Sequence, residues 1–476
     1  MLYFRPENGA VGDAIPFYWR GEYHLFYLLA RPVEDPRARI STSWAHAVSK
    51  DLVSWKELPR ALEPAGTVGS PDESACWTGS VIEHEGTFHI FYTGGRLVET
   101  AFRQTICHAT SADLVTWVKD QKNPIVEADP RWYEPHDWRD PFVYWSSEHR
   151  RFEMLIAARG LRGWSPRRGC IAVAVSSDLR EWSVQAPGWE PQLTHVHECP
   201  ELFTVGGRQY LAYSTYSEDN VTHYRLARRD GSYRTPGPND SIDGRFYYAA
   251  KGLNDGRRQV TFGWIPEVTG RSDEGEIMWA GDLGIPHVLR PGRGGALHVS
   301  YPESLLSLFP RELEMRQVAG EVSAGKGRFF LRSDGGTAHV LCSRQPRVFY
   351  MRLDLAMGRN TASAGLILDA DRDLDHGCFL EFETASRCLR LFKYPRGVAQ
   401  RRRKIIVQRT LPFAVGSAAV EVFYENGMLT VFVNKSACLS ARTYERGDLF
   451  GFFVQSGRAR CLRVSVRVPD GDGGGT

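Results

Sequence analysis

Several features that would assign a protein to a specialised class are missing from this sequence of 476 residues. No run of about eighteen apolar residues occurs, so we expect no membrane-spanning helix and no membrane partner. The segment Met1–Pro6 lacks a basic head followed by an apolar core, so we expect no secretory signal. Basic and acidic residues nearly balance, at 59 and 56, and this balance argues against nucleic acid as a partner.

Cysteine is present but lacks the patterns that build disulfide frameworks or zinc sites. The nine cysteines are scattered, odd in number and contain no Cys-x-x-Cys pair. We therefore expect reduced thiols and a cytoplasmic protein. The one basic run, Arg401-Arg402-Arg403-Lys404, is short, and we interpret it as a solvated loop or strand edge rather than as a binding patch.

Aromatic residues and glycine are plentiful. The hydrophobic fraction is 42%, and the chain holds 46 glycines and 13 tryptophans. Such a chain can bury a sizeable core, and its composition suits short strands and tight turns better than long helices. Its length predicts two or three domains.

Two repeated patterns organise the first 300 residues or so. The first is Ser-x-Asp-Leu-x-x-Trp, which occurs at residues 49–55, 111–117 and 176–182. The second is a turn followed by an alternating, mostly aromatic run, which occurs five times, at residues 21–27, 86–92, 151–156, 207–213 and 256–262. The shared offset of the tryptophans predicts equivalent packing sites between neighbouring units.

The repeats predict an all-β protein. Each copy reads as a hairpin followed by further strands, and four antiparallel strands repeated radially describe a propeller blade. Five copies predict a five-bladed β-propeller over residues 1–295, which we take as the catalytic domain. The stretch from Ile285 to Glu314 is rich in proline and glycine, and residues 296–319 are predicted as a linker. Alternating runs then predict a C-terminal β-sandwich over residues 320–469, and residues 470–476 are predicted to be a disordered tail.

Three carboxylates occupy the same place in three of the five units. Asp13, Asp140 and Glu198 each lie eight to eleven residues before the hairpin turn, at the start of the first predicted strand. The other two units place residues 77–80 and 246–249 there. Because the first strand of each blade lines the central channel, we expect these residues to meet at one mouth of that channel.

Such a group of carboxylates is typical of enzymes that cleave glycosidic bonds. A pair about 5–5.5 Å apart hydrolyses with retention, and a pair about 6.5–9.5 Å apart with inversion. Spacing along the sequence leaves both outcomes open. Crowding of like charges also raises one pKa, as a general acid requires. Any one of the three residues alone is better explained as a turn former or as a partner of Arg139, but their shared register favours a function.

At these residues the chain resembles glycoside hydrolase family 32, which contains invertases, levanases and inulinases. The segments that carry the resemblance are Trp44–Trp55, Trp77-Thr78-Gly79-Ser80, Arg139-Asp140-Pro141, Glu198-Cys199-Pro200 and Asp243–Ala249. The resemblance implies a propeller followed by a sandwich, and a retaining mechanism with no cofactor and no metal. It also implies that Asp13 is the nucleophile, Asp140 the transition-state stabiliser and Glu198 the acid/base.

The first family motif, Trp-x-Asn-Asp-Pro-Asn-Gly, is altered here. Val11-Gly12-Asp13-Ala14-Ile15-Pro16-Phe17 keeps the aspartate, a displaced proline and neither asparagine. We expect the chemistry to persist with an altered substrate. The residues that we predict to bind it are Trp19, Trp44, Trp77, Ser80, Arg139 and Tyr248.

The resulting hypothesis is a hydrolase that cleaves β-fructofuranosidic bonds in sucrose-like or short fructan substrates. Three alternatives stay open: a fructosyltransferase, a hydrolase of another furanoside such as an arabinofuranoside, and an inactive carbohydrate-binding propeller. The expected partner is a small sugar or an oligosaccharide. The oligomeric state and the role of the sandwich are left open.

Overall fold

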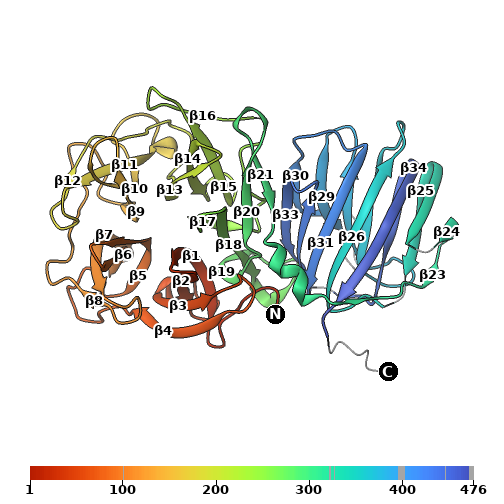
Figure 1. Cartoon of the computed structure of the whole chain (residues 1–476), viewed down its shortest axis with the longest axis horizontal. Coiled ribbons are helices and arrows are strands. Elements are labelled where there is room, and N and C mark those ends of the chain that lie inside the picture. Colours follow the sequence, from red (N-terminus) through yellow and green to blue (C-terminus); the bar gives the residue numbers. More distant parts are fainter. Residues whose placement is uncertain are drawn as a thin grey trace.

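The computed structural model describes residues 1–99, 101–237, 239–320, 323–325, 327–342, 344–394, 403–444 and 446–470. Arg401 and Arg402 of the predicted basic run and residues 471–476 of the predicted tail lie outside these ranges. Within them the protein is nearly all β, as expected, in two parts that lie side by side (Figure 1). No helix among these residues has both the length and the apolar composition that crossing a bilayer requires.

The first part begins with a four-stranded run and continues with three separate four-stranded antiparallel sheets. The run is β1(Ala10–Trp19), β2(Glu22–Ala30), β3(Ser43–Ser49) and β4(Lys56–Leu62). The sheets are β5(Ala75–His84) to β8(Val118–Lys119) with β6(Thr87–Val98) and β7(Ala101–Ser111); β9(Arg139–Ser146) to β12(Ser183–Val184) with β10(Arg151–Arg159) and β11(Gly169–Ser176); and β13(Glu198–Val205) to β16(Tyr233–Arg234) with β14(Arg208–Thr215) and β15(Val221–Ala227).

A fifth run of strands joins the first into one nine-stranded sheet. Its members are β17(Tyr248–Asn254), β18(Gln259–Val268), β20(His287–Pro291) and β21(Leu297–Ser300). Strand β19(Ile277–Leu283) pairs with β18 on one side and with β1 on the other. The last strands of this part are therefore hydrogen-bonded to its first strand.

The first strands of the five runs lie innermost around a common centre (Figure 1). They contact one another in a closed order, β1 to β5, β9, β13, β17 and back to β1. Because β21 pairs with β20, this part continues past the boundary predicted at residue 295.

The Ser-x-Asp-Leu-x-x-Trp repeat builds both the turns and the contacts between sheets. In its first copy, the Oδ1 atom of Asp51 accepts hydrogen bonds from the backbone N–H groups of Val53 and Ser54, each at 2.8 Å. The tryptophan then packs edge-on against a phenylalanine of the neighbouring run in the ring, which for Trp55 is the fifth run. The pairs are Trp55–Phe262, Trp117–Phe26 and Trp182–Phe91, with ring centroids 6.1, 5.9 and 5.5 Å apart. The predicted equivalence of the tryptophans is confirmed.

Short non-β elements connect the strands. They are α1(Pro36–Ile40), η1(Ser165–Arg167), η2(Thr269–Arg271), η3(Arg293–Gly295) and η4(Glu303–Leu308). The segment predicted as a linker contains η4 and three strands, β21, β22(Arg311–Glu312) and β23(Gln317–Ala319).

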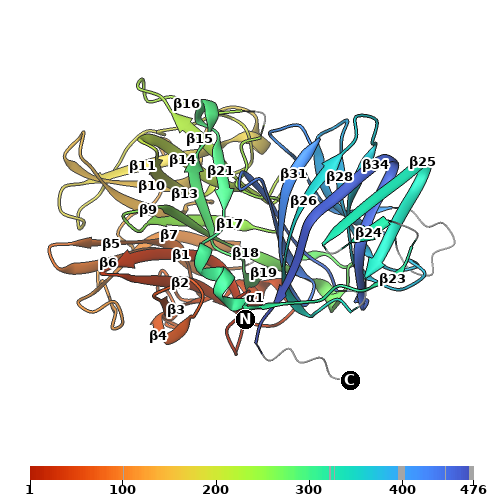
Figure 2. The same ribbon diagram turned by 45° about the vertical axis from the view of Figure 1, so that its right-hand side comes forward.

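The second part is a sandwich held together by two long strands, β25(Arg328–Cys342) and β34(Leu449–Val468), at its outer side (Figure 2). The first half of β34 pairs with β27 and the second half with β26, so this strand passes from one layer into the other. The remaining strands are β24(Ser323–Gly325), β26(Val348–Met357), β27(Ser363–Ala370), β28(Cys378–Glu383), β29(Cys388–Lys393), β30(Lys404–Thr410), β31(Ser417–Glu425), β32(Met428–Val433) and β33(Ala437–Arg442).

A buried carboxylate ties the two parts together. Asp243, just before β17, accepts hydrogen bonds from the N–H of Ser440 at 2.9 Å and from its hydroxyl at 2.7 Å. His287 of β20 contacts the same carboxylate at 2.9 Å. Burial alone would raise the pKa of Asp243, but the bonds and charges of its neighbours lower it to about 2. The junction therefore depends on an ionised group with no exposure to water.

We predict that Asp243→Asn lowers the thermal midpoint markedly, because an amide nitrogen would replace an oxygen that accepts these bonds. The expected loss of stability is about 2–4 kcal/mol. The pKa of Asp243 is lowered, so its stabilisation is present above about pH 4 and is lost as the pH falls toward 2. Calorimetry from pH 2 to 7 on wild type and variant should show this acid-dependent component in wild type alone. Asp334→Asn, at an exposed residue, is the matched control. Equal melting curves for all three proteins would contradict the prediction.

Candidate active site

Each of the five innermost strands is interrupted by a β-bulge close to its start. The residues inside the bulges are Gly12-Asp13, Thr78, Asp140-Pro141, Cys199-Pro200 and Ala249-Ala250. A bulge breaks the alternation of a strand and re-aims a side chain. Asp140 and Cys199 also adopt positive φ angles of 60° and 49°, which are uncommon outside glycine.

The bulges lie around a cavity of about 300 Å³ at the centre of the ring. The cavity is lined by Asp13, Leu28, Ile40, Trp77, Thr78, Gln104, Asp137, Arg139, Asp140, Glu198, Tyr216 and Trp279. The three carboxylates that sequence predicted to meet therefore lie in one hollow, contributed by β1, β9 and β13.

Asp13 is held through both of its carboxylate oxygens. Trp264 Nε1 donates to Oδ1 at 2.9 Å, and Thr78 Oγ1 donates to Oδ2 at 2.5 Å. Burial raises the pKa of Asp13, and these two bonds oppose the rise because they stabilise the ionised form. The carboxylate is thus fixed in orientation and shielded from bulk water.

Asp140 is fixed by backbone as well as by charge. Its N–H donates to Thr93 Oγ1 at 2.8 Å, and its Oδ2 accepts from the N–H of Cys199 at 2.9 Å. The Cys199 thiol also lies 3.7 Å from this Oδ2 and 3.6 Å from Oδ2 of Asp13. One sulfur atom therefore contacts both aspartates. Burial raises the pKa of Asp140, the nearby Arg139 guanidinium opposes the rise, and the Asp13 charge adds to it.

Glu198 lies between a cation and a phenol. Arg139 donates to its Oε1 at 3.0 Å, and the Tyr248 hydroxyl donates to Oε2. Burial raises the pKa of Glu198, Arg139 opposes the rise, and the charge of Asp140 adds to it. Among the three carboxylates, Glu198 has the most exposed side chain, at 19%. A raised pKa and access to the cavity suit a proton donor.

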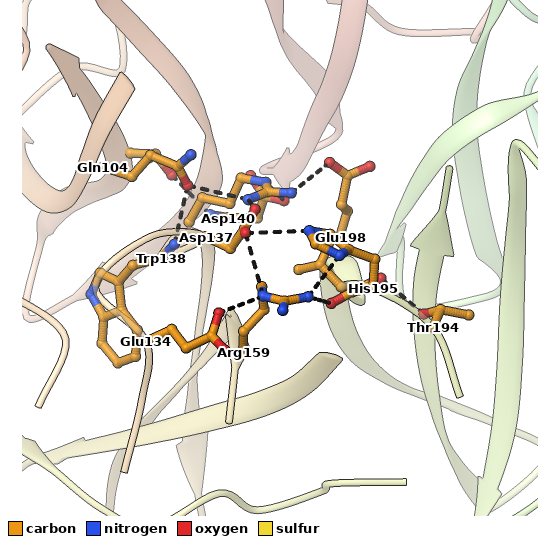
Figure 3. Close-up of polar contacts among 12 residues, drawn as sticks. Gln104, Glu134, Asp137, Trp138, Asp140, Arg159, Thr194, His195 and Glu198 are labelled. Carbon is orange, nitrogen blue, oxygen red and sulfur yellow. Dashed lines mark hydrogen bonds and ion pairs between the residues drawn. The ribbon is translucent and has the colours of Figure 1, made fainter. Parts of the chain in front are cut away.

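A chain of ion pairs extends outward from Glu198 (Figure 3). Arg139 also donates to Oδ1 of Asp137 at 2.6 Å, and Oδ2 of Asp137 lies 3.8 Å from Arg159 and 3.6 Å from His195. Arg159 in turn donates to Glu134 at 2.7 Å. The network fixes the guanidinium that contacts the catalytic candidates.

The remaining wall of the cavity is apolar. It is made by Leu28 from β2, Ile40 at the end of α1, Trp77 from β5 and Trp279 from β19. A methyl group placed on Gly12 would lie 2.5 Å from the Trp279 ring and 3.1 Å from Cβ of Leu28. The absence of a side chain at residue 12 therefore lets the tryptophan pack directly beside Asp13.

Not all of the predicted substrate-binding residues line the cavity. Arg139 and Trp77 do, and Tyr248 reaches it through its bond to Glu198. Trp19 lies at the far end of β1, roughly 20 Å along the strand from Asp13, and packs against Phe17 and Phe88. This prediction fails because the tryptophan side chain belongs to the outer packing between sheets.

Trp44 and Ser80 are also corrected. Trp44 is fully buried in the core between the first two runs, where its indole N–H donates to the carbonyl of Trp77 at 2.9 Å. Ser80 is buried, and its hydroxyl accepts from the N–H of Val143 at 3.0 Å. Trp44 therefore supports the cavity residue Trp77 from behind, whereas Ser80 links β5 to β9.

Sequence reasoning missed several lining residues, among them Gln104, Asp137, Tyr216 and Trp279. Only Asp137 carried a usable signal, since it lies two residues before Arg139 in the sequence. The others come from strands and loops outside the first strands, so the repeat register did not point to them.

One group of side chains in the described part of the chain could share a metal ion, and it lies at the junction between the two parts. Its members are Asp243, His287 and Cys438. The oxygens of Asp243 already accept bonds from Ser440, Gly244 and His287. The oxygens that would bind a metal ion are therefore already engaged by protein donors. The group also lies outside the cavity.

Comparison with known families identifies the chain. The model of the glycosyl hydrolases family 32 N-terminal domain matches residues 3–300, which include the whole cavity. The chain belongs to glycosyl hydrolase family 32.

Relatives of this family-32 chain include two plant enzymes. The insoluble β-fructofuranosidase isoenzyme CWINV6 of Arabidopsis thaliana is 27% identical over 63% of this chain and 58% of its own length. The fructan 1-exohydrolase w2 of Triticum aestivum is 28% identical over 66% of this chain and 56% of its own length. The chain thus spans little more than half the length of these curated relatives.

A solved structure shows the same fold. The exo-inulinase of Aspergillus awamori superposes with a TM-score of 0.76 at 20% identity, covering 98% of this chain and 97% of that one. The arrangement of both parts of this family-32 chain is therefore shared with that protein.

We predict that Gly12→Ala disturbs the cavity wall, because its new methyl group would overlap the Trp279 ring. Overpacking of this kind costs about 1–3 kcal/mol, and a shift of the Trp279 ring changes the shape of the cavity that it lines. Thermal unfolding and tryptophan emission would report both effects. Gly416→Ala is the control, because a methyl group there meets no atom within 4 Å. Matching melting points and spectra for both variants would contradict the prediction.

Proposed function

We propose that this chain is a retaining glycoside hydrolase of β-fructofuranosidic bonds in sucrose-like or short fructan substrates, built on a five-bladed β-propeller. The observation that carries the proposal is the convergence of Asp13, Asp140 and Glu198 in one buried cavity of a family-32 domain. Support comes from the relatives, which are named as a β-fructofuranosidase, a fructan 1-exohydrolase and an exo-inulinase.

In the first step, a carboxylate oxygen of Asp13 attacks the anomeric carbon of the bound sugar. The bond from that carbon to the leaving oxygen breaks, and Glu198 gives its proton to that oxygen. The hydrogen bonds from Thr78 and Trp264 keep Asp13 oriented, and burial favours the protonated form of Glu198 before the step.

In the second step, Glu198 takes a proton from water, and the resulting hydroxide oxygen attacks the same carbon. The ester to Asp13 breaks and the sugar leaves with its original stereochemistry. Asp140 does not bond to the anomeric carbon in this scheme. Its carboxylate holds sugar hydroxyl groups and stabilises the positive charge that develops on the ring.

Location in the cytoplasm is part of the proposal. The nine cysteines are all buried and carry free thiols in the structure. Free thiols persist in a reducing compartment.

We predict that Asp13→Asn and Glu198→Gln abolish hydrolysis, because each removes a group that exchanges an electron pair or a proton with substrate. Release of free fructose from sucrose and from short fructans should fall by about 10²–10⁴-fold or more. Asp334→Asn and Glu314→Gln alter exposed carboxylates of the sandwich part and serve as controls that should retain the wild-type rate. A rate above a tenth of wild type in either cavity variant, with wild-type circular dichroism, would rule out these roles.

A second candidate is a hydrolase of another furanoside, such as an arabinofuranoside. The observation that favours it is the apolar wall of Leu28 and Trp279 beside Asp13, which accepts a ring carrying fewer polar substituents. A panel of aryl furanosides and short fructans separates the two candidates by relative kcat/KM.

The products at high substrate concentration then separate hydrolysis from transfer, since a free monosaccharide as sole product excludes a transferase. Binding with no turnover of any substrate would instead favour a carbohydrate-binding protein.

A further inference from the structure

A second layer of residues lies immediately beneath the bulges. On each innermost strand it is formed by the first residue that resumes pairing after the bulge. These residues are Ala14, Gly79, Phe142, Glu201 and Lys251. Two of them are small and one is aromatic, so Glu201 and Lys251 are the charged members of the layer.

Lys251 is an unusual member because its ammonium group is buried without a hydrogen-bond partner among the described residues. The residue is 2% exposed. Its Nζ atom lies 5.3 Å from the centre of the Phe142 ring. Phe142 belongs to β9, whereas Lys251 belongs to β17, and β13 contacts both of these strands. The side chain therefore reaches across the layer beneath the first residues of β13, where Cys199 contacts Asp140.

Glu201 is held away from the cavity by the backbone. It is 3% exposed, and its Oε2 accepts a hydrogen bond from the N–H of Gly252 at 2.7 Å. Burial raises the pKa of Glu201 to about 7, even though the nearby Lys251 opposes the rise. Glu201 is therefore a weak counter-charge for the ammonium group near neutral pH.

Titratable groups from four of the innermost strands face Asp140. They are Asp13 of β1, Arg139 of β9 itself, Glu198 and Cys199 of β13 and Lys251 of β17. Arg139 is shared, since it lies 2.6 Å from Asp137, 3.0 Å from Glu198 and 3.9 Å from Asp140. Its best contacts are to the other two carboxylates. Lys251 is the remaining cation of this set.

We propose that Lys251 is a positioning residue whose ammonium group, held beneath the bulges of β9 and β13, keeps Asp140 in its charged form. The proposal rests on the function proposed above. In that reaction Asp140 must be an anion while positive charge develops on the sugar ring, and Asp13 must also be one before it attacks. A buried cation beneath the bulge of Asp140 favours the charged form of that carboxyl without touching the substrate.

The test is the pH profile of kcat/KM for fructoside hydrolysis in wild type, Lys251→Met and Lys251→Arg. Loss of the cation raises the pKa of the carboxylate that it stabilises, so activity is lost at a higher pH as the solution is acidified. We expect the acidic limb of Lys251→Met to move up by about one pH unit, which is about a tenfold loss of kcat/KM below the limb. Lys251→Arg should restore the wild-type limb. An unchanged limb in a folded Lys251→Met protein would overturn the proposal, even with a lower overall rate.

A second neutral variant keeps the proposal testable. Lys251→Gln removes the charge and keeps a polar side chain, so the acidic limb should move up as in Lys251→Met. A limb at the wild-type pH would overturn the proposal. This variant decides the matter if Lys251→Met does not fold.

A titration that needs no turnover separates this inference from the proposed function. Infrared difference spectra of the carboxyl band are recorded against pH for wild type and Lys251→Met, and the same spectra of Asp140→Asn assign the signal of Asp140. A higher midpoint for Asp140 in Lys251→Met supports the role of Lys251 even if no fructoside is cleaved. Identical midpoints overturn it even if hydrolysis is confirmed.

Discussion

The structure depends on keeping several carboxyl groups close together in a place that water barely reaches. Asp13, Asp140 and Glu198 share one cavity, and burial raises the pKa of each. Left alone, such a group would take up protons until little charge remained. The protein opposes this with the Arg139 guanidinium, with hydrogen bonds from Thr78 and from the backbone N–H of Cys199, and with a network of ion pairs behind the arginine. The balance differs from one carboxyl to the next, and unequal protonation is what acid/base chemistry requires.

The geometry that permits this crowding is a backbone device repeated around the ring. Each innermost strand has a bulge near its start, and the bulges of β1, β5 and β9 present Asp13, Thr78 and Asp140 to the cavity. Three bulge residues, Asp140, Cys199 and Ala249, hold positive φ angles, which a free chain would seldom adopt. The surrounding sheets enforce them, and the closed order of contacts leaves no free edge at the centre. Position in the repeat, rather than proximity in the chain, therefore decides which residues meet.

Much of this arrangement could be predicted from sequence, because the repeats expose the register of the first strands. The turns capped by Asp51 and its equivalents, and the convergence of the three carboxylates, follow from that register. The sequence does not reveal which side of a strand each tryptophan faces. It also does not reveal which residues outside the first strands complete the wall of the cavity. Trp19 and Trp44 share the aromatic character of Trp77, yet both belong to packing between sheets. Trp279 comes from β19, whose pairing with β1 bridges nearly the whole first part of the chain.

The charged lining and the apolar lining of the cavity come from different strands. The acidic and basic groups come mainly from β9 and β13, whereas the apolar wall beside Asp13 depends on β2, α1 and β19. Trp279 sits on the strand that joins the last run of the ring to the first, and Arg39 of α1 anchors this strand through the carbonyls of Trp279 and Ala280. Arg39 is itself paired with Glu267 at 2.5 Å. Because one strand shapes the cavity and also closes the ring, a substitution that widens the cavity at Trp279 acts on the closure as well. Changes in substrate preference are therefore expected to cost less stability at Leu28, whose strand β2 pairs with β1 and β3 inside the first run, than at Trp279, whose strand joins the last run to the first.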